Sequence, residues 1–216
     1  MKNIIFIAPP AAGKGTMSEV LIEKYGYKHI STGDILRSMA KTNDDFGKEL
    51  NAILSSGNLV SDEIVFEAIK RRLSMNDLDN GFILDGFPRN IEQAREYDKI
   101  LKELNKDLGV VIYLDTPRDV LEKRIIGRRL CKDCGASYNV LTGVNTPKRE
   151  NICDKCGGEL YQRTDDNLES FETRYSTFME KTYPLVEYYE KENVLHRVTS
   201  VDVDNTMKEI EAIIND

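Results

Sequence analysis

A glycine, a lysine and a threonine stand close together near the start of the chain, in the run Pro9-Pro10-Ala11-Ala12-Gly13-Lys14-Gly15-Thr16. A short apolar segment precedes this run and a helical pattern of apolar residues follows it, which predicts a strand, a loop and a helix. The backbone N–H groups of such a loop and the positive end of the following helix bind phosphates, and Lys14 adds a mobile positive charge. Thr16 offers a hydroxyl to the magnesium ion that accompanies a nucleoside triphosphate. The run therefore predicts a phosphate-binding loop.

This loop departs from the usual pattern at two points. The common spelling is a glycine, any four residues, a glycine, a lysine and then serine or threonine. Here Ala8 replaces the first glycine, and Thr16 comes one residue later than usual. A glycine is needed at position 8 only if the backbone takes a positive φ there or approaches another group closely. Taken alone, the pattern leaves a purely structural turn open.

The second distinctive feature is a set of four cysteines in the segment 130–161, which is rich in Gly, Asn, Thr and Lys. Two C-x-x-C pairs, separated by 18 residues, match the spacing of a paired-knuckle zinc site. The residues are Cys131, Cys134, Cys153 and Cys156. Four thiolates complete a closed tetrahedron, so we expect structural Zn²⁺ that folds the segment. Two disulfides or four unrelated thiols are the alternatives, and the expected cytosolic setting together with the doubled C-x-x-C favours metal.

Length, charge and hydrophobicity limit the classes of protein. A chain of 216 residues fits one domain with insertions or two small domains. The net charge of −7 disfavours nucleic acid as the main partner, because such binding requires clustered excess Lys and Arg. No apolar run approaches the roughly 18 residues that span a bilayer, and the N-terminus does not resemble a signal peptide. We therefore expect a cytoplasmic protein without a nucleic-acid or membrane partner.

Strand and helix patterns alternate along the chain and form the frame that must position these residues. Strands are expected at about 4–7, 27–30, 82–85, 110–114 and 194–198, with amphipathic helices between them. Strands separated by helices of ten or more residues predict a parallel sheet covered on both faces. Thr116 is expected to cap the helix that follows the fourth strand.

Six motifs, in their order and spacing, carry a resemblance to a known family. They are the loop at 9–16, Ser31-Thr32-Gly33-Asp34-Ile35-Leu36-Arg37, Gly57-Asn58-Leu59-Val60-Ser61-Asp62, Leu84-Asp85-Gly86-Phe87-Pro88-Arg89, Gly127-Arg128-Arg129 and Arg163-Thr164-Asp165-Asp166. From about residue 3 to its C-terminus the chain resembles bacterial adenylate kinase of the long form with a zinc-binding lid. The resemblance implies an α/β fold with a five-stranded parallel sheet of the P-loop type. It divides the chain into core (1–30, 61–126 and 165–216), a helical AMP-binding insert (31–60) and a zinc lid (127–164).

The implied reaction is the magnesium-dependent, reversible transfer ATP + AMP ⇌ 2 ADP. The protein's task in such a transfer is to align donor and acceptor and to stabilise the charge on the moving group. Planar guanidinium groups can grip phosphate oxygens in pairs. The resemblance assigns catalytic roles to Lys14, Asp85, Arg89, Arg124, Arg128, Arg163 and Arg174. Arg124 and Arg174 could instead form surface ion pairs.

The same resemblance places the two nucleotides. ATP is expected on Ala11, Ala12, Gly13, Lys14, Gly15, Thr16, Arg128, Ser137 and Tyr138. AMP is expected on Thr32, Arg37, Asn58, Leu59, Val60, Gly86, Phe87, Pro88, Arg89, Gln93, Arg163 and Arg174. Gln93 presents both a donor and an acceptor to adenine, and Asp85 is expected to hold Mg²⁺ through water. His29 and His196 are expected to be structural, and packing on the cysteine segment is the alternative for Tyr138.

Departures from the family pattern keep other functions open. Ala8 and Ala11 replace loop glycines, and residues 141–147 differ from the aromatic, proline-rich lid of the family. The alternatives are a kinase for UMP, CMP or GMP, a nucleotide-binding protein without turnover, and a zinc-ribbon protein that binds nucleic acid. The near-balanced charges of 131–161 disfavour the last. We expect an active monomer whose partners are ATP, AMP and ADP.

Overall fold

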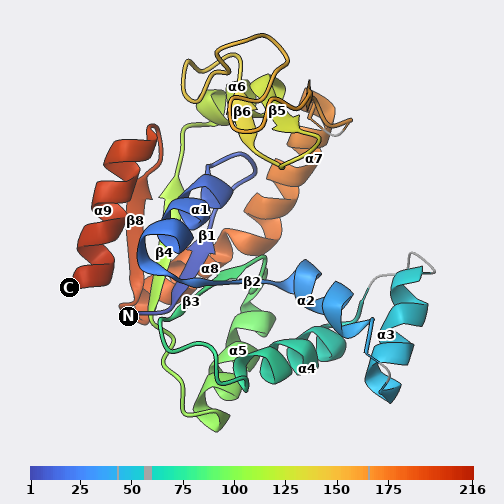
Figure 1. The fold of residues 1–216 in the computed structure, drawn as a ribbon. Coiled ribbons are helices and arrows are strands. Elements are labelled where there is room, and N and C mark those ends of the chain that lie inside the picture. Colours follow the sequence, from blue (N-terminus) through green and yellow to red (C-terminus); the bar gives the residue numbers. More distant parts are fainter. Residues whose placement is uncertain (43, 56–59, 165) are drawn as a thin grey trace.

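The structure, a computed structural model, describes residues 1–42, 44–55, 60–164 and 166–216. Within these ranges five strands form a parallel sheet, as the alternating pattern predicts (Figure 1). In spatial order they are β2 (Lys28–Ser31), β3 (Phe82–Asp85), β1 (Ile4–Ile7), β4 (Val110–Asp115) and β8 (Leu195–Thr199). The loop that follows β1 lies at the carboxyl edge of the sheet, where ligands bind in open α/β sheets. Because β1 is the central strand, the loop lies in the middle of that edge.

Helices cover both faces of this sheet. In chain order they are α1 (Lys14–Tyr25), α2 (Thr32–Met39), α3 (Asp45–Ser55), α4 (Asp62–Leu73), α5 (Ile91–Glu103), α6 (Arg118–Gly127), α7 (Leu168–Thr177), the π-helical turn η1 (Phe178–Thr182), α8 (Pro184–Lys191) and α9 (Val203–Asn215). Successive side chains of a strand point to opposite faces. Ile4 and Phe6 of β1 accordingly join a core with α1, α6 and α9, whereas Ile5 and Ile7 join a core with α4, α5 and α8.

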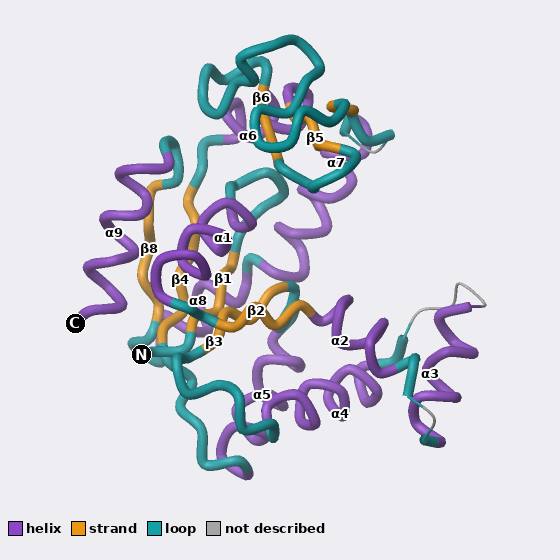
Figure 2. Tube along the Cα trace, viewed as in Figure 1, coloured by secondary structure: helices purple, strands orange, loops and turns teal. Residues whose placement is uncertain are grey.

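The cysteine-containing segment, residues 128–161, folds apart from the main sheet and is called the ribbon segment below. Its strands form an antiparallel sheet among the described residues, in the order β6 (Ser137–Asn139), β5 (Arg128–Cys131) and β7 (Leu160–Tyr161). Figure 2 shows that loops make up most of this segment, which lies between the ends of α6 and α7. Because so little of it is regular, the ribbon segment depends on a small core that includes the buried side chains of Cys131, Tyr138 and Cys153.

One local prediction is wrong. The Thr116 side chain does not cap α6, which begins at Arg118 with Pro117 as the flanking residue. Instead the Thr116 hydroxyl donates a hydrogen bond to the carbonyl of Ser200, at 3.2 Å, and thereby ties the end of β4 to the end of β8. In the part of the chain that the structure describes, we find no helix with the length and apolar character needed to cross a bilayer.

Candidate active site

The loop after β1 takes the conformation of a phosphate-binding loop. Gly13 has a φ of 96° and stands immediately before α1, so the free N–H groups of the first helical turn face the loop. Ala11 also has a positive φ, of 66°, while Ala8 does not. The missing glycine at position 8 is therefore tolerated, whereas the strain at Ala11 costs about 1 kcal/mol.

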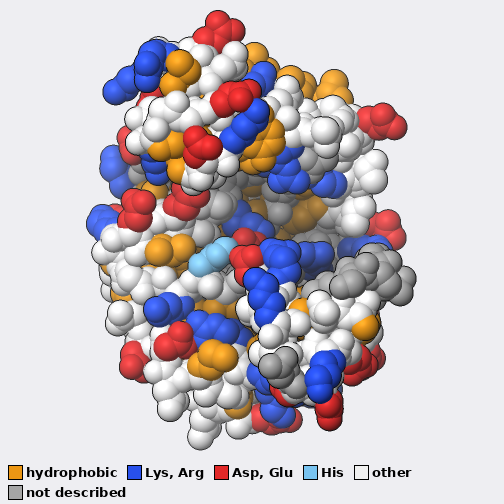
Figure 3. Space-filling view, turned by 45° about the vertical axis from the view of Figure 1, so that its right-hand side comes forward, with side chains coloured by type: hydrophobic (Ala, Val, Ile, Leu, Met, Phe, Trp, Pro, Cys, Tyr) orange, Lys and Arg blue, Asp and Glu red, His pale blue; other side chains and the backbone are white. Residues whose placement is uncertain are grey.

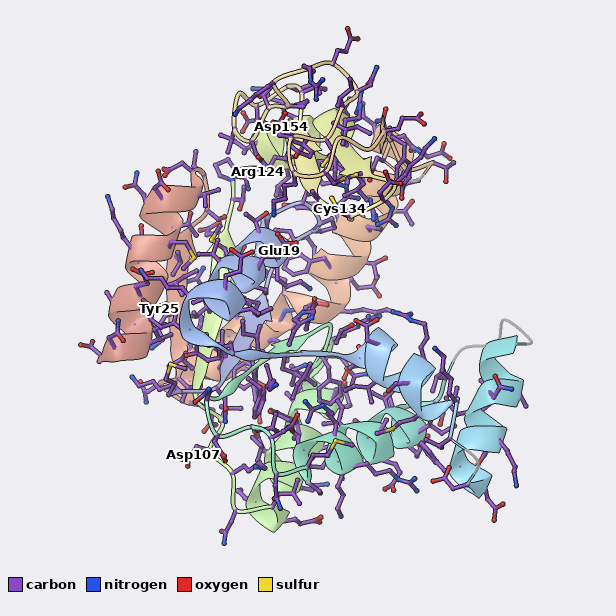
Figure 4. All side chains as sticks on the ribbon, in the orientation of Figure 1. Glu19, Tyr25, Asp107, Arg124, Cys134 and Asp154 are labelled. Carbon is purple, nitrogen blue, oxygen red and sulfur yellow. The ribbon has the colours of Figure 1, made fainter. Side chains whose placement is uncertain are left out.

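Two donors from other parts of the chain hold this loop in place. The Ser200 hydroxyl donates to the Ala12 carbonyl at 2.7 Å, and Nη1 of Arg124 donates to the same oxygen at 3.2 Å. Nη2 of Arg124 donates to the Val201 carbonyl at 2.7 Å. Figure 4 shows Arg124 between the core and the ribbon segment, and burial lowers the pKa of its guanidinium. The backbone amides of the loop are thus fixed before any ligand arrives.

Lys14, Asp85 and His29 form one cluster, with Lys14 after the loop that follows β1, Asp85 at the carboxyl end of β3 and His29 within β2. The Lys14 ammonium forms an ion pair with Asp85. His29 Nε2 lies 3.2 Å from the second carboxylate oxygen. Burial works against the charge on Asp85, but the hydrogen bond from His29 and the charge of Lys14 are stronger and hold its pKa below 3.8, the ordinary value. The carboxylate is therefore ionised at neutral pH.

A cavity of about 680 Å³ opens above this loop and reaches the ribbon segment. Its size is that of a small-molecule site. Predicted site residues that line it are Ala11, Ala12, Gly13, Lys14, Gly15, Thr16, Arg89, Arg124, Arg128, Ser137, Tyr138 and Arg174. Figure 3 shows one face of the molecule, on which Lys and Arg side chains gather around a hollow between the upper and lower parts. A cavity with cations on several walls suits a ligand with several phosphates.

The four cysteines converge, as their spacing predicts. Their sulfur atoms all lie within 4.8 Å of one another. The Cys131–Cys156 and Cys134–Cys153 pairs are separated by 3.4 and 3.6 Å. Tetrahedral zinc with bonds of about 2.3 Å needs sulfur atoms about 3.8 Å apart. The arrangement therefore fits a zinc site with four thiolate ligands and is too open for disulfides, whose sulfur atoms lie about 2.05 Å apart.

A buried tyrosine supports the cysteine cluster. The Tyr138 hydroxyl accepts a hydrogen bond from the backbone N–H of Asp154 at 2.8 Å and lies 3.4 Å from Cys153 Sγ. Because its single proton is not used by Asp154, the hydroxyl can donate to the sulfur. This hydrogen bond lowers the pKa of the Cys153 thiol to about 6. The same residue also lines the cavity, so both interpretations of Tyr138 from the sequence agree with its place.

Comparison with known proteins identifies the family. The family model described as adenylate kinase matches residues 6–194. The chain belongs to the adenylate kinase family. Proteins named adenylate kinase from Thermosipho africanus and Archaeoglobus fulgidus are each 46% identical over 213 residues, which is 98% of this chain and 99% and 97% of those proteins. The adenylate kinase of Bacillus licheniformis is 42% identical over 214 residues, 99% of this chain and 96% of that protein. The resemblance to bacterial adenylate kinases is thereby confirmed.

The arginines of the expected site do not all reach the cavity. Arg37 is exposed and pairs with Asp34, three residues earlier, at 2.5 Å. Arg163 is exposed and is not among the residues that line the cavity. Arg128 lines the cavity, but its fork grips the buried carboxylate of Asp166. The structure thus brings Arg89, Arg124, Arg128 and Arg174 together at the cavity and leaves the other two at a distance from it.

Some of the residues expected to bind AMP, among them Thr32 and Gln93, lie at the loop 86–89, between β3 and α5. The Thr32 hydroxyl lies 3.5 Å from the Gly86 carbonyl, and the hydroxyl of Thr182, in η1, donates to the Arg89 carbonyl at 3.0 Å. Phe87 is buried against Tyr97, and Val60 packs against the same core. Asn58 and Leu59 lie outside the described residues. Several separate segments of the chain therefore meet beside the cavity.

Several residues of the site carry no signal in the sequence. Ser200 holds the phosphate loop, yet in the sequence it is an ordinary residue after a strand. His29 was expected to be structural and lies against Asp85, the partner of Lys14. The position of Ser200 follows from strand order, because the strands of the parallel sheet, including β8, all end at the same edge. Only the three-dimensional arrangement reveals them.

Proposed function

We propose that this adenylate kinase family member catalyses ATP + AMP ⇌ 2 ADP, with ATP on the phosphate loop and AMP at the loop 86–89. The observation that carries the proposal is the cavity whose walls bring Lys14 together with Arg89, Arg128 and Arg174. These groups come from separate parts of the chain, so cations surround the space between the two expected nucleotides. The proteins at 42–46% identity are named for the same activity.

In the proposed mechanism the chain positions phosphates and stabilises their charge. The N–H groups of the loop before α1 hold the inner phosphates of ATP. Lys14 leaves its ion pair with Asp85 and binds the outer phosphates. Arg89 and Arg174 stabilise the transferred group and the AMP phosphate from the opposite side. Bound Mg²⁺ would be held by the Thr16 hydroxyl and, through water, by Asp85, and it neutralises charge on the phosphates. Oxygen donors of this kind suit Mg²⁺.

The peripheral parts of the chain complete the proposal. Residues 31–60 form the AMP-binding insert and residues 127–164 the lid, and both must move for Arg37 and Arg163 to reach the phosphates. Closure of this kind excludes water from the reacting groups. Four cysteines hold structural Zn²⁺, which folds the lid. We further propose a cytoplasmic monomer; the cytoplasm is in keeping with four cysteines that are not disulfide-bonded.

An acceptor comparison tests this function. Purified protein with MgATP is given AMP, UMP, CMP or GMP, ADP formation is followed by a coupled assay, and zinc is quantified on the same sample. We expect AMP to be the best acceptor and one zinc per chain. A preference for another acceptor would identify a sister kinase, and ATP binding without any ADP formation would identify a protein without turnover.

A further inference from the structure

The side chain of Gln93, in the first turn of α5, is held by two partners of opposite character. Its Nε2 donates to Oδ1 of Asp62 at 2.7 Å, and its Oε1 accepts from the backbone N–H of Arg89 at 2.8 Å. Its own backbone N–H is capped by Asn90 Oδ1, also at 2.8 Å. Both the position and the side chain of Gln93, which is 8% exposed, are therefore fixed by neighbours.

These partners determine which end of the amide is oxygen and which is nitrogen. A carboxylate can only accept a hydrogen bond, and a backbone N–H can only donate one. A flipped amide would set its oxygen against the Asp62 carboxylate and its NH2 group against the Arg89 N–H, so both contacts would become repulsive. The backbone N–H of residue 89 donates to Gln93 whatever side chain residue 89 carries. Of the two partners, only Asp62 can therefore be altered by a substitution.

We propose that Asp62 is a specificity-determining residue that fixes the polarity of the Gln93 amide and so selects adenine as the acceptor base. The inference rests on the proposed function, with AMP at the loop 86–89, and on the role that the resemblance gives Gln93 at the adenine base. With one N–H and one lone pair committed to the protein, the amide keeps one donor and one acceptor for a ligand.

The fixed polarity distinguishes two bases of nearly equal shape. Adenine carries an N–H donor at C6 and an acceptor at N1, whereas hypoxanthine carries an acceptor at C6 and a donor at N1. An amide that cannot turn over pairs with the first arrangement and meets like groups in the second. Sites of this kind discriminate strongly, because the wrong base leaves buried polar groups unpaired.

Asp62→Asn tests the proposal, since asparagine can accept from or donate to either end of the amide. The discrimination between AMP and IMP, measured as the ratio of their kcat/KM values with MgATP, should fall about tenfold. This is the size expected for one charge-assisted hydrogen bond that solvent partly screens. The KM for ATP should not change. Glu63→Gln removes the same charge from the next residue, which is not a hydrogen-bond partner of the Gln93 side chain in the described part of the chain, and should keep the wild-type ratio.

The outcomes are separable. A ratio in Asp62→Asn equal to that of the wild type, or an equal fall in Glu63→Gln, would overturn the proposal, and so would a loss of activity that affects AMP and IMP equally. Asp62→Ala, with thermal unfolding measured alongside, repeats the test without an amide at position 62. A wild-type protein that does not phosphorylate AMP would refute the proposed function itself.

Discussion

Asp85 provides the sharpest test of how the site is held together before ligands bind. Its carboxylate contacts Lys14 and His29, and its side chain is 24% exposed. Asp85→Asn keeps the shape and an oxygen that can accept from His29, but it leaves the Lys14 charge without its partner. A hydrogen bond to a charged group contributes about 1.5–3 kcal/mol. Allowing for partial exposure, we expect the free energy of unfolding to fall by about 2 kcal/mol at pH 7.

The pH dependence of this difference follows from the lowered pKa of Asp85. A carboxyl group whose pKa is lower in the folded protein contributes stability that is fully present above its unfolded pKa, here 3.8. The contribution is lost as the pH falls toward the folded pKa. Urea unfolding of wild type and Asp85→Asn should therefore show a difference in the free energy of unfolding that shrinks below about pH 4.

Asp115 supplies a matched control, because it ends β4, on the other side of β1 from β3, and its side chain is exposed. Asp115→Asn should change the free energy of unfolding by no more than about 0.5 kcal/mol. The reasoning would be refuted by an Asp85→Asn effect no larger than that of the control. The reasoning would also be refuted if the free energies of unfolding of wild type and Asp85→Asn differed by the same amount at pH 3 as at pH 7.

Two further predictions concern the ribbon segment and the phosphate loop. Tyr138→Phe removes the hydroxyl that donates to Cys153, so zinc affinity measured by chelator competition should fall by about tenfold or more, while Tyr161→Phe, at an exposed position of the ribbon segment, should not change it. Ala8→Gly should lower the free energy of unfolding by about 0.5–1 kcal/mol, since it adds flexibility at an ordinary φ. Ala11→Gly, which relieves a positive φ, should not lower it, and equal losses in urea unfolding of the two variants would contradict this account.

Much of the fold was predictable because its signals are local. The three middle strands β1, β3 and β4 are apolar runs, as buried parallel strands require, and all five strands appear within one residue or so of their expected bounds. Asn90 is a residue type that favours the start of a helix, and its side chain accepts from the Gln93 N–H at the start of α5. The convergence of the cysteines was predictable as well, because each C-x-x-C turn aims two sulfur atoms at one point.

The parts that could not be predicted depend on contacts distant in sequence. Thr116 has the pattern of a helix cap, but the Ser200 carbonyl, 84 residues away, takes its hydroxyl. The link between Asp62 and Gln93 spans 31 residues and joins two helix starts. Arg37 fails to reach the cavity for a local reason, since the carboxylate of Asp34 lies one helical turn earlier on the same face. Motif order locates such residues, but not their partners.

The central claim is that two nucleotides lie end to end in one cavity and exchange a phosphoryl group directly. Initial rates measured while ATP and AMP are both varied test it most directly. We predict intersecting lines in the double-reciprocal plot, as a complex with both nucleotides requires, and no labelled protein after incubation with ATP labelled in its γ-phosphate. Parallel lines together with a phosphorylated protein would show a covalent intermediate and would contradict the account.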